Sequence, residues 1–562
     1  MSEQYDAIVV GSGITGGWAA KTLCEQGLKV LLLERGRDLP HRSGYKNEMK
    51  APWELPFRGE GDQAFLNEHQ TVQQHNIHLD EWTQDYWVKD SEHPYHTQND
   101  TAFNWYRGYH LGGRSIMWGR QCYRWSDTDF EANVKDGHGT DWPVRYKDLE
   151  SWYDKVETFI GVSGAKENLP QLPDGQFQPP MALTPVETHM REHIAAHYPD
   201  RRLTIGRTAN LTESKPEEGR AACQSRYICG RGCSYGAYFS TQSSTLPAAM
   251  ATGNLTVKTD AVVETVDYDS ELKRARGVTV ISRLDKKRTQ YAARMVFLCA
   301  GAFNSVALLQ RSVSDAFPQG LANNSGVLGK YIMDHASTLG VASIVPGFND
   351  HYYYGNRPTG IVIPRFVNMG EDKREFLRGF SYQGGAYRPS WSRGTNMPGL
   401  GHAFKENLRQ PGDWKFVLTT FAECLPREDN AISQNWQAKD ADGLPVLNIN
   451  FAFGKNELDL LSAAKEEAAA MVAKAGGHVL FGSDRPNPGG SAIHEMGGAR
   501  MGRDAKTSIL NGYNQSHDVP NLFVTDGAAM ASSACQNPSL TYMALTARAA
   551  TYAAEQLRAG RV

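Results

Sequence analysis

The chain has 562 residues, of which 40% are hydrophobic, and its 59 basic and 62 acidic residues give a formal net charge of −3. This length exceeds what one hydrophobic core normally serves, so two domains with room to bury a large cofactor are expected. The balanced charge argues against a nucleic-acid partner, and no stretch of the sequence reaches the ~18 consecutive apolar residues that a direct membrane span needs.

A glycine-rich turn joins the first two predicted strands. Apolar residues 7–10 and 30–33 are typical of buried strands, and a helix is expected between them over residues 18–26. In the turn Gly11-Ser-Gly13-Ile-Thr15-Gly16, the first glycine allows a tight turn, the second lets a pyrophosphate approach the backbone, and the third permits close helix packing. The turn therefore predicts a dinucleotide site.

An acidic residue ends the second predicted strand. Glu34, which Arg35 follows, occupies the place from which a carboxylate accepts hydrogen bonds from an adenosine ribose. A carboxylate there argues against a 2′-phosphate on the cofactor. On this motif alone, FAD and NAD both remain open.

The middle of the chain is rich in aromatic residues and then in strands. Residues 80–125 have the aromatic density that suits a wall around a flat ligand. Beyond them, strands are expected at residues 255–258, 261–266, 277–281 and 295–300, followed by Gly301 and a helix from Ser305. These strands would complete the nucleotide-binding half.

A different pattern follows in residues 340–453, where predicted strands alternate with Pro and Gly turns. One long helix is then expected over residues 457–474, before two glycines. We interpret this region as a substrate domain inserted into the nucleotide-binding domain.

Three of the eight cysteines, Cys223, Cys229 and Cys233, lie together on a short glycine-rich loop. Their thiolates can converge on one metal centre. Tetrahedral zinc is disfavoured because no fourth Cys or His lies within about ten residues on either side, whereas three ligands suit a three-iron cluster. The alternative is three buried or loop thiols, with or without one disulfide.

The sequence motifs at the two ends of the chain resemble the glucose-methanol-choline (GMC) oxidoreductase family. The resemblance rests on the glycine turn, on the segment from Arg107 to Ser115, on His494-Glu-Met-Gly-Gly and on Asn537-Pro538, and it spans most of the chain. It implies an α/β fold with a doubly wound, Rossmann-like FAD-binding domain and an inserted α+β substrate-binding domain. It also favours FAD over NAD.

The closer likeness is to the sugar dehydrogenase and pyranose oxidase branch of that family. Some members of the branch link their flavin to a His that precedes a Trp, and this chain has Met117 before Trp118 at that place. We therefore expect FAD to be held non-covalently. The resemblance implies the cofactor-binding residues Gly11, Gly13, Thr15, Gly16, Glu34, Arg35, Arg107, Gly112, Gly113, Ser115, Met117, Trp118, Val262, Ala300, Gly301, Asp526, Gly527, Asn537 and Pro538.

The same resemblance implies the domain limits. The FAD-binding domain is expected to be discontinuous, with residues 1–45, 100–140, 218–335 and 490–562. The substrate-binding domain and the segments next to the cysteines are expected to comprise residues 46–99, 141–217 and 336–489.

His494 and Asn537 are the candidate catalytic pair, because family members place His with His, or His with Asn, at these two positions. Alcohol oxidation removes a hydroxyl proton as a hydride leaves carbon, and imidazole titrates near neutral pH. The Asn537 amide can hydrogen-bond the same oxygen. The alternative for His494 is a packed core histidine.

The resemblance implies a dehydrogenase that oxidises a secondary hydroxyl, expected at C3, of a pyranose or glycoside. Hydride would pass to flavin N5 and the proton to His494, and glucoside 3-dehydrogenase is the nearest named activity. The cysteine spacing resembles that of sugar dehydrogenases in which a 3Fe-4S cluster relays electrons to a cytochrome c. The alternatives are an oxygen-using glycoside or pyranose 3-oxidase that produces hydrogen peroxide, and a non-catalytic flavin electron-transfer protein.

The location follows from the same comparison. Residues 1–5 run into the first predicted strand without a charged and then apolar leader, so we expect no signal peptide of the chain's own. Similar dehydrogenases pair with a small subunit that carries the export signal. A periplasmic location by co-export with such a partner is therefore expected, and otherwise a cytoplasmic one.

Overall fold

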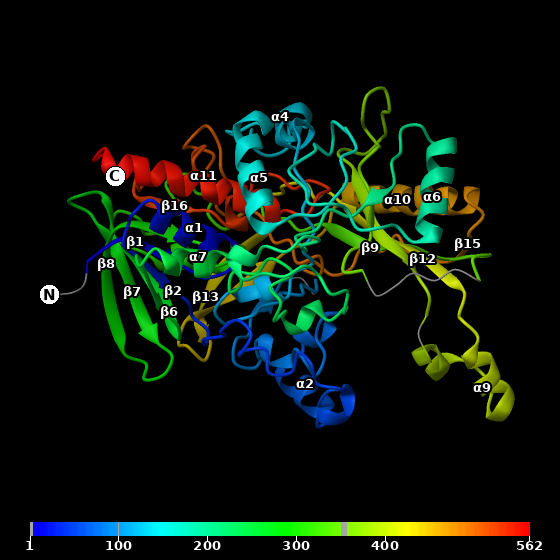
Figure 1. Ribbon diagram of the computed structural model, residues 1–562. Helices are drawn as coiled ribbons and strands as arrows, with labels where there is room; N and C mark the ends of the chain where they lie inside the picture. The colour runs from blue at the N-terminus through cyan, green and yellow to red at the C-terminus, as the bar shows by residue number, and fades with distance from the viewer. Residues whose placement is uncertain (1–3, 99–100, 350–356, 390) are drawn as a thin grey trace.

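The described part of the chain forms two large β-sheets and one small sheet (Figure 1). The computed structural model describes residues 4–98, 101–349, 357–389 and 391–562. The first sheet has the order β5-β2-β1-β8-β7-β6, with β16 paired to β8. Its strands are β1 (Tyr5–Val10), β2 (Val30–Leu33), β5 (Leu255–Lys258), β6 (Ala261–Asp269), β7 (Arg274–Ser282), β8 (Arg288–Leu298) and β16 (Leu522–Val524).

Strand β8 belongs to two kinds of pairing. Its first half pairs antiparallel with β7, where Ile281 faces Arg288, while its second half runs parallel to β1 and β16. Strands β1, β2 and β5 are also mutually parallel. The carboxyl ends of β1, β2, β8 and β16 therefore meet at one edge of the sheet, where ligands bind in open α/β folds.

Helices pack around this sheet. Helix α1 (Ile14–Glu25) contacts α7 (Thr245–Ala251) and α11 (Ser539–Arg558), and α11 contacts α5 (Tyr146–Ile160). Helix α8 (Ala302–Arg311) packs against β6. The first and last long helices of the chain thus lie against each other, as the blue and red ribbons of Figure 1 show.

The second sheet is antiparallel, with the order β15-β9-β12-β11-β10-β4. Its strands are β4 (Thr204–Ile205), β9 (Ala336–Val345), β10 (Ile361–Ile363), β11 (Phe380–Tyr387), β12 (Trp414–Ala422) and β15 (His478–Gly482). Helices α10 (Lys455–Lys474) and α6 (Pro185–His197) cover one face. Strand β12 alternates accordingly: Trp414, Phe416 and Leu418 are buried in a core with α10, while the residues between them face the other way.

The remaining elements are short. The third sheet consists of β13 (Ala431–Lys439), β14 (Pro445–Asn450) and β3 (His96–Thr97). Among the described residues, the other α-helices are α2 (Gln63–His69), α3 (Asp127–Phe130), α4 (Ala132–Asp136) and α9 (Gly401–Arg409). Short 3-10 segments span Pro52–Glu54, Gln73–His75, Gln84–Tyr86, Gly113–Ile116, Pro216–Glu218, Cys229–Arg231, Trp391–Asn396 and Gly527–Ala529.

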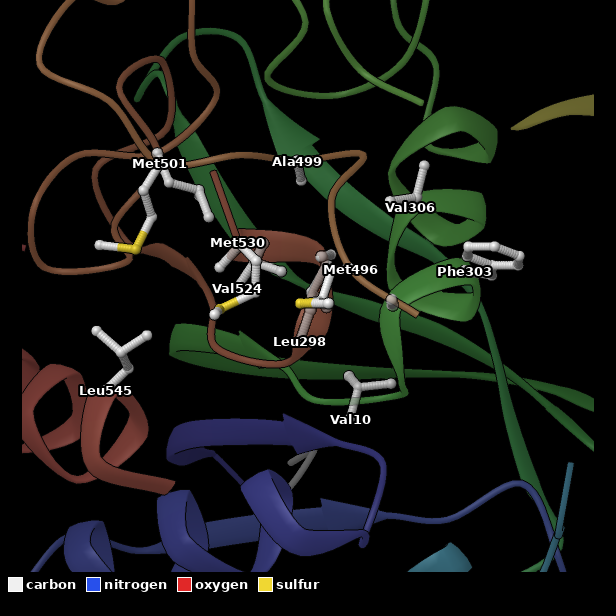
Figure 2. Close-up of a cluster of buried hydrophobic side chains, with 14 of the residues drawn as sticks. Val10, Leu298, Phe303, Val306, Met496, Ala499, Met501, Val524, Met530 and Leu545 are labelled. Atoms are coloured by element: carbon white, nitrogen blue, oxygen red, sulfur yellow. The ribbon is translucent and has the colours of Figure 1, made fainter. Parts of the chain in front are cut away.

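A buried apolar cluster joins the two ends of the chain beneath the strand edge (Figure 2). Val10, Leu298 and Val524, at or next to the ends of β1, β8 and β16, share this core with Met496 and with Phe303 of α8. Burying a side chain of this size contributes about 1.5–3 kcal/mol relative to leaving it exposed. The shared core therefore fixes the turns that follow these strands relative to one another.

The predicted strands and helices are present, with shifted ends. Helix α1 begins at Ile14 instead of residue 18, inside the glycine motif and directly after Gly13, and α8 begins at Ala302 instead of Ser305. Strand β8 ends at Leu298, so Ala300 and Gly301 lie in a turn, where Gly301 takes a positive φ of 91° that only glycine adopts easily. The long helix begins at Lys455.

The doubly wound α/β architecture is confirmed, whereas the domain limits stay a prediction. Among the described residues, no helix combines the length and the apolar character needed to cross a bilayer.

Candidate functional site

A cavity of about 2000 Å³ lies between the carboxyl edge of the first sheet and the open face of the second. One wall is formed by the turns after β1, β2, β8 and β16, and the opposite wall by Gln383, Val417, Thr419 and Phe421 of β11 and β12. A single small ligand occupies roughly 300–1,000 Å³, so this cavity has room for a cofactor and a substrate together.

The glycine turn forms part of the cavity wall, and its three glycines have two different roles. A Cβ on Gly11 would lie 2.5 Å from the carbonyl oxygen of Cys299, and one on Gly16 would lie 1.8 Å from that of Gly11. A Cβ on Gly13 would meet nothing within 4 Å. Gly11 and Gly16 thus permit close backbone packing, while Gly13 leaves the start of α1 open to an anion.

Glu34 is buried at the end of β2 and holds the turn together. Its carboxylate accepts hydrogen bonds from the Ser12 amide (3.1 Å), the Ser12 hydroxyl (2.5 Å) and the Gly36 amide (2.9 Å). Burial raises the pKa of Glu34. The Ser12 hydroxyl in turn accepts from the Gly112 amide at 2.8 Å, which links the turn at residue 112 to the glycine turn.

The two predicted arginines of the cofactor site are already paired. Arg35 lies over the Tyr109 ring, 4.1 Å from its centroid, and forms ion pairs with Asp440 and Asp442 at 3.1 and 2.7 Å. Arg107 pairs with Asp90 at 3.0 Å. Both line the cavity, and their carboxylate partners balance their charges.

Asp526 joins two of the cavity turns. Its carboxylate accepts from the Gly301 amide (2.9 Å), the Ser305 hydroxyl (2.5 Å) and the Ala528 amide (3.0 Å). Burial raises its pKa to about 6. A Cβ on Gly301 would meet nothing within 4 Å, so this turn, like Gly13, is open where a ligand can approach.

Most of the predicted cofactor residues line this one cavity. Gly16 and Gly112 do not, because each packs against protein atoms. The residues that do line it are Gly11, Gly13, Thr15, Glu34, Arg35, Arg107, Gly113, Ser115, Met117, Trp118, Val262, Ala300, Gly301, Asp526, Gly527, Asn537 and Pro538. An open, glycine-backed edge at several parallel strand ends fits a dinucleotide cofactor.

His494 and Asn537 also line the cavity and contact each other. The Nδ2 atom of Asn537 lies 3.1 Å from Nε2 of His494, and the Oδ1 atom of Asn537 accepts from Nε2 of Gln383 at 2.5 Å. Burial, and then the nearby His335 and Arg114, lower the pKa of His494 well below its ordinary value. The imidazole is therefore neutral at pH 7 and able to accept a proton.

The backbone before His494 is strained. Ile493 has a φ of 62°, which a β-branched residue rarely adopts. The two amides that flank it, of Ala492 and His494, both donate to the carboxylate of Asp334, at 3.3 and 3.1 Å. Burial, followed by Glu495, raises the pKa of Asp334 to about 7. Asp334 thus fixes the backbone conformation that orients the His494 side chain.

The three clustered cysteines lie on a loop at another part of the cavity wall, called here the cysteine loop (residues 220–238). Cys229 lines the cavity, whereas Cys223 and Cys233 do not. The Ser225 amide donates to Sγ of Cys223 at 3.4 Å, and Arg226 Nη2 lies 3.7 Å from Sγ of Cys233. All eight cysteines are free, so the disulfide alternative is wrong for this structure.

In the described part of the chain, two groups of side chains each bring three possible metal-ligand atoms within 4.8 Å of one another. They are Asp334, His335 and His494, and His93, Asp440 and Asp442, and the three cysteine thiols form no group this tight. The second group is occupied by Arg35, which pairs with both aspartates. Ligands of an iron-sulfur cluster bind different iron atoms, so the 4.8 Å limit does not exclude one.

Three residues at the site were not singled out from the sequence as functional, and for a fourth, His335, the likeness to similar proteins did not separate a functional role from packing. Ser12 links two turns, Gln383 holds the Asn537 amide, Arg114 pairs with Glu495 at 3.0 Å, and His335 contacts the His494 ring. Ser12 lies inside the glycine motif, which was a signal for it. Gln383 and His335 are brought to the site by β11 and β9, and their spacing along the chain gives no such signal.

The chain matches two family models, both described as GMC oxidoreductase, over residues 5–337 and 426–546. The 2-methyl-1,2-propanediol dehydrogenase of Mycolicibacterium austroafricanum is 28% identical over 98% of this chain and 95% of its own. The fructose dehydrogenase large subunit of Gluconobacter japonicus is 24% identical, over 99% and 98%. The C-glycoside 3-oxidase of Arthrobacter globiformis is 32% identical, but over only 24% of this chain and 26% of its own.

Among solved structures, a variant of the formate oxidase from Aspergillus oryzae RIB40 superposes with a TM-score of 0.62 at 14% identity, covering all of both chains. At this identity the likeness concerns the fold. The family and its flavoenzyme neighbours support FAD as the cofactor of the cavity.

Proposed function

Because the chain belongs to the GMC oxidoreductase family, which acts on CH-OH groups, we propose that it is an FAD-dependent dehydrogenase oxidising a secondary hydroxyl, at C3, of a pyranose or glycoside. The observation that carries this proposal is the contact of His494 Nε2 with Asn537 Nδ2, 3.1 Å apart, in the same cavity as the glycine turn. The pair offers one proton acceptor and one hydrogen-bond donor to a single oxygen.

The residues divide the work of the site. Gly13, Gly301 and the start of α1 would hold the FAD diphosphate without a covalent bond, and bound FAD supplies a hydride acceptor. His494 Nε2 would accept the hydroxyl proton, while the Asn537 amide would donate to the substrate oxygen and hold it in place.

The open face of the second sheet would hold the sugar. Gln383 and Thr419 supply polar groups there, and the backbone of Gly384 and Gly385 also lines this wall. Sites for sugars combine polar groups with apolar surface, which Val417 and Phe421 provide. The names of a fructose dehydrogenase subunit and a C-glycoside 3-oxidase among the relatives favour a sugar, and the second favours position 3.

The cysteine loop would provide the exit for electrons. We propose that Cys223, Cys229 and Cys233 hold a 3Fe-4S cluster that passes electrons to a cytochrome c, and that a small partner subunit co-exports the chain to the periplasm. Three features support a cluster: three free thiols, an amide donor to Cys223, and the positive charge of Arg226 beside Cys233. The 3-10 turn Cys229–Arg231 also contacts the turn Gly113–Ile116 of the cofactor wall.

The competing function is an oxygen-using glycoside 3-oxidase, which the name of the Arthrobacter relative favours. An oxidase needs no cluster, because dioxygen takes the electrons from the flavin.

One experiment separates the two functions. The purified protein is analysed for FAD, iron and sulfide under anaerobic conditions, and is then mixed with glucose or a methyl glucoside while dye reduction and peroxide are followed. Our proposal predicts iron and sulfide, sugar-dependent bleaching of the flavin, dye reduction and little peroxide. Cys233→Ser is the matched variant, and it should lose iron but retain flavin bleaching. Full-rate peroxide formation by an iron-free protein contradicts the dehydrogenase, and a colourless protein contradicts the whole proposal.

A further inference from the structure

An unbroken row of hydrogen bonds runs through the catalytic imidazole, from the Ala534 carbonyl through His335, His494 and Asn537 to Gln383. We propose that His335 is a positioning residue that fixes the tautomer of His494, with its proton on Nδ1 and the lone pair of Nε2 turned to the substrate. This proposal rests on the proposed function and specifies how its base is prepared.

The direction of the row is set at the Ala534 end. A carbonyl oxygen can only accept, so the Nε2 atom of His335 that contacts Ala534 must carry a proton. A neutral imidazole has one N–H, so the Nδ1 atom of His335 must then be an acceptor. It lies 2.9 Å from Nδ1 of His494, which must therefore be the donor. The Nε2 atom of His494 is left without a proton.

The tautomer of His494 with its proton on Nε2 is incompatible with this geometry. A proton on Nε2 of His494 would leave its Nδ1 bare against Nδ1 of His335, so that His335 would have to donate from Nδ1. Its own Nε2 would then turn a lone pair to the Ala534 carbonyl, which is repulsive. Both rings stay neutral at pH 7, since burial lowers the pKa of His335 to about 4 and also lowers that of His494.

The hydrogen bonds at the Gln383 end of the row are consistent with the same tautomer of His494. The amide of Asn537 receives a hydrogen bond on Oδ1 from Gln383, and this turns its Nδ2 donor toward the bare Nε2 of His494. A substrate hydroxyl that enters between these atoms meets a donor and an acceptor. The same amide would otherwise be free to rotate and offer its oxygen instead.

The surroundings hold both rings still. Asp334, next to His335 in sequence, clamps the backbone amide of His494, and the Phe421 ring contacts both imidazoles at centroid distances of 6.1 and 6.0 Å. The charged groups nearest to His494 are Asp334 and the Arg114–Glu495 ion pair. His335 is fully surrounded by protein, and its role is exerted through His494 alone.

The test uses three variants of the FAD-loaded protein. His335→Leu removes the acceptor, whereas His335→Asn places an amide oxygen near the position of Nδ1 and retains one. Phe421→Leu is the matched control, because it loosens the packing around both rings without touching a hydrogen bond of the row. Each protein is labelled with 15N-histidine, and the His494 signals are assigned from their loss in His494→Ala.

The NMR readout needs no substrate. We expect the wild type, Phe421→Leu and His335→Asn to show His494 with a proton on Nδ1 and a bare Nε2. His335→Leu should show a mixture of tautomers or the Nε2–H form. If His335→Leu keeps the wild-type tautomer, or if the wild type itself carries the proton on Nε2, the proposal is overturned.

Anaerobic stopped-flow reduction of the flavin gives the second readout. General-base catalysis contributes about 10²–10⁴-fold, so His335→Leu should reduce the flavin at least tenfold more slowly with little change in KM, and His335→Asn should recover most of that loss. If no sugar bleaches the flavin of any variant while the tautomer still changes in His335→Leu, the proposed substrate is wrong and the role of His335 stands.

Discussion

The wall of the cavity around His494 and the wall formed by the cysteine loop are held in different ways. At His494, neutral groups in a row of hydrogen bonds fix the rings, with His335 buried and His494, Asn537 and Gln383 partly buried. In the cysteine loop, the ion pair of Glu48 with Arg226 (2.7 Å) holds an irregular backbone in which Tyr227 is 70% exposed. Burial among neutral groups favours an imidazole that stays unprotonated, whereas an ion pair holds the more exposed cysteine loop.

This contrast predicts that substitutions at the two walls have separate effects. Substitutions around His494 should affect proton transfer and leave the cysteine loop intact. Substitutions in the cysteine loop should disturb the loop and leave proton transfer unchanged.

The largest effect is expected from His494→Ala, which removes the base. The rate of sugar-dependent flavin reduction should fall about 10²–10⁴-fold, because proton transfer in the transition state is lost. Anaerobic stopped-flow absorbance measures it. His517→Ala is the matched control, since His517 bonds to Ser508 and does not line the cavity. A rate for His494→Ala within a few-fold of wild type would show that another residue is the base.

Asn537→Ala should lower the same rate by about 100-fold, the usual loss when one donor to a developing oxyanion is removed. Gln383→Ala, which leaves the amide in place and removes its hydrogen-bond partner, should have a smaller effect of about tenfold. Iron content should stay unchanged in both variants. Equal rates for Asn537→Ala and wild type would contradict a role for this amide.

At the cysteine loop, Glu48→Gln should loosen the chain without slowing proton transfer. The Glu48 carboxylate is buried and accepts hydrogen bonds from the Ser234 amide and from Arg226. Weakening these bonds should lower the free energy of local opening of the loop by about 1–3 kcal/mol. Hydrogen exchange followed by mass spectrometry should show faster exchange in residues 220–238, together with less bound iron. The exposed Glu54 nearby provides the control Glu54→Gln. Unchanged exchange in Glu48→Gln would show that the ion pair does not hold the loop.

The smallest effect concerns pH. The pKa of His494 is lowered by burial, then by His335 and Arg114, so the active neutral form persists as the pH falls below 6.5. The acid limb of kcat/KM should therefore lie below pH 6.5. Arg114→Met removes a cation that disfavours the protonated ring, so this limb should move to higher pH in that variant. An unchanged limb would show that Arg114 does not act on the base.

The sequence predicted the groups that lie close to one another along the chain better than those brought together by the fold. Gly11, Gly13 and Glu34 follow a local pattern that any dinucleotide-binding turn requires, so their place at a strand edge was predictable. The contact of His494 with Asn537 was expected from the family likeness alone, because 42 residues separate them. The packing role of Gly16 was predicted from the same motif, whereas the spacing did not reveal that Gly112 packs away from the cavity.

Long-range partners could not be predicted. Arg35 was expected at the cofactor, but its ion pairs with Asp440 and Asp442 depend on a hairpin some 400 residues later. His335 contacts His494 only because the segment before β9, residues 333–335, lies against residues 492–496. Such contacts follow from packing, which a pattern of residue types does not encode pair by pair.

The late arrival of β16 in the first sheet has a consequence for synthesis. Strands β1 and β8 are made long before β16, so the second half of β8 lacks its β16 neighbour until residues 522–524 have been made. Until then a nascent chain exposes an apolar strand edge, which invites aggregation and chaperone binding. Because Asn537 and α11 come later still, the wall of the cavity is complete only after these residues have been made.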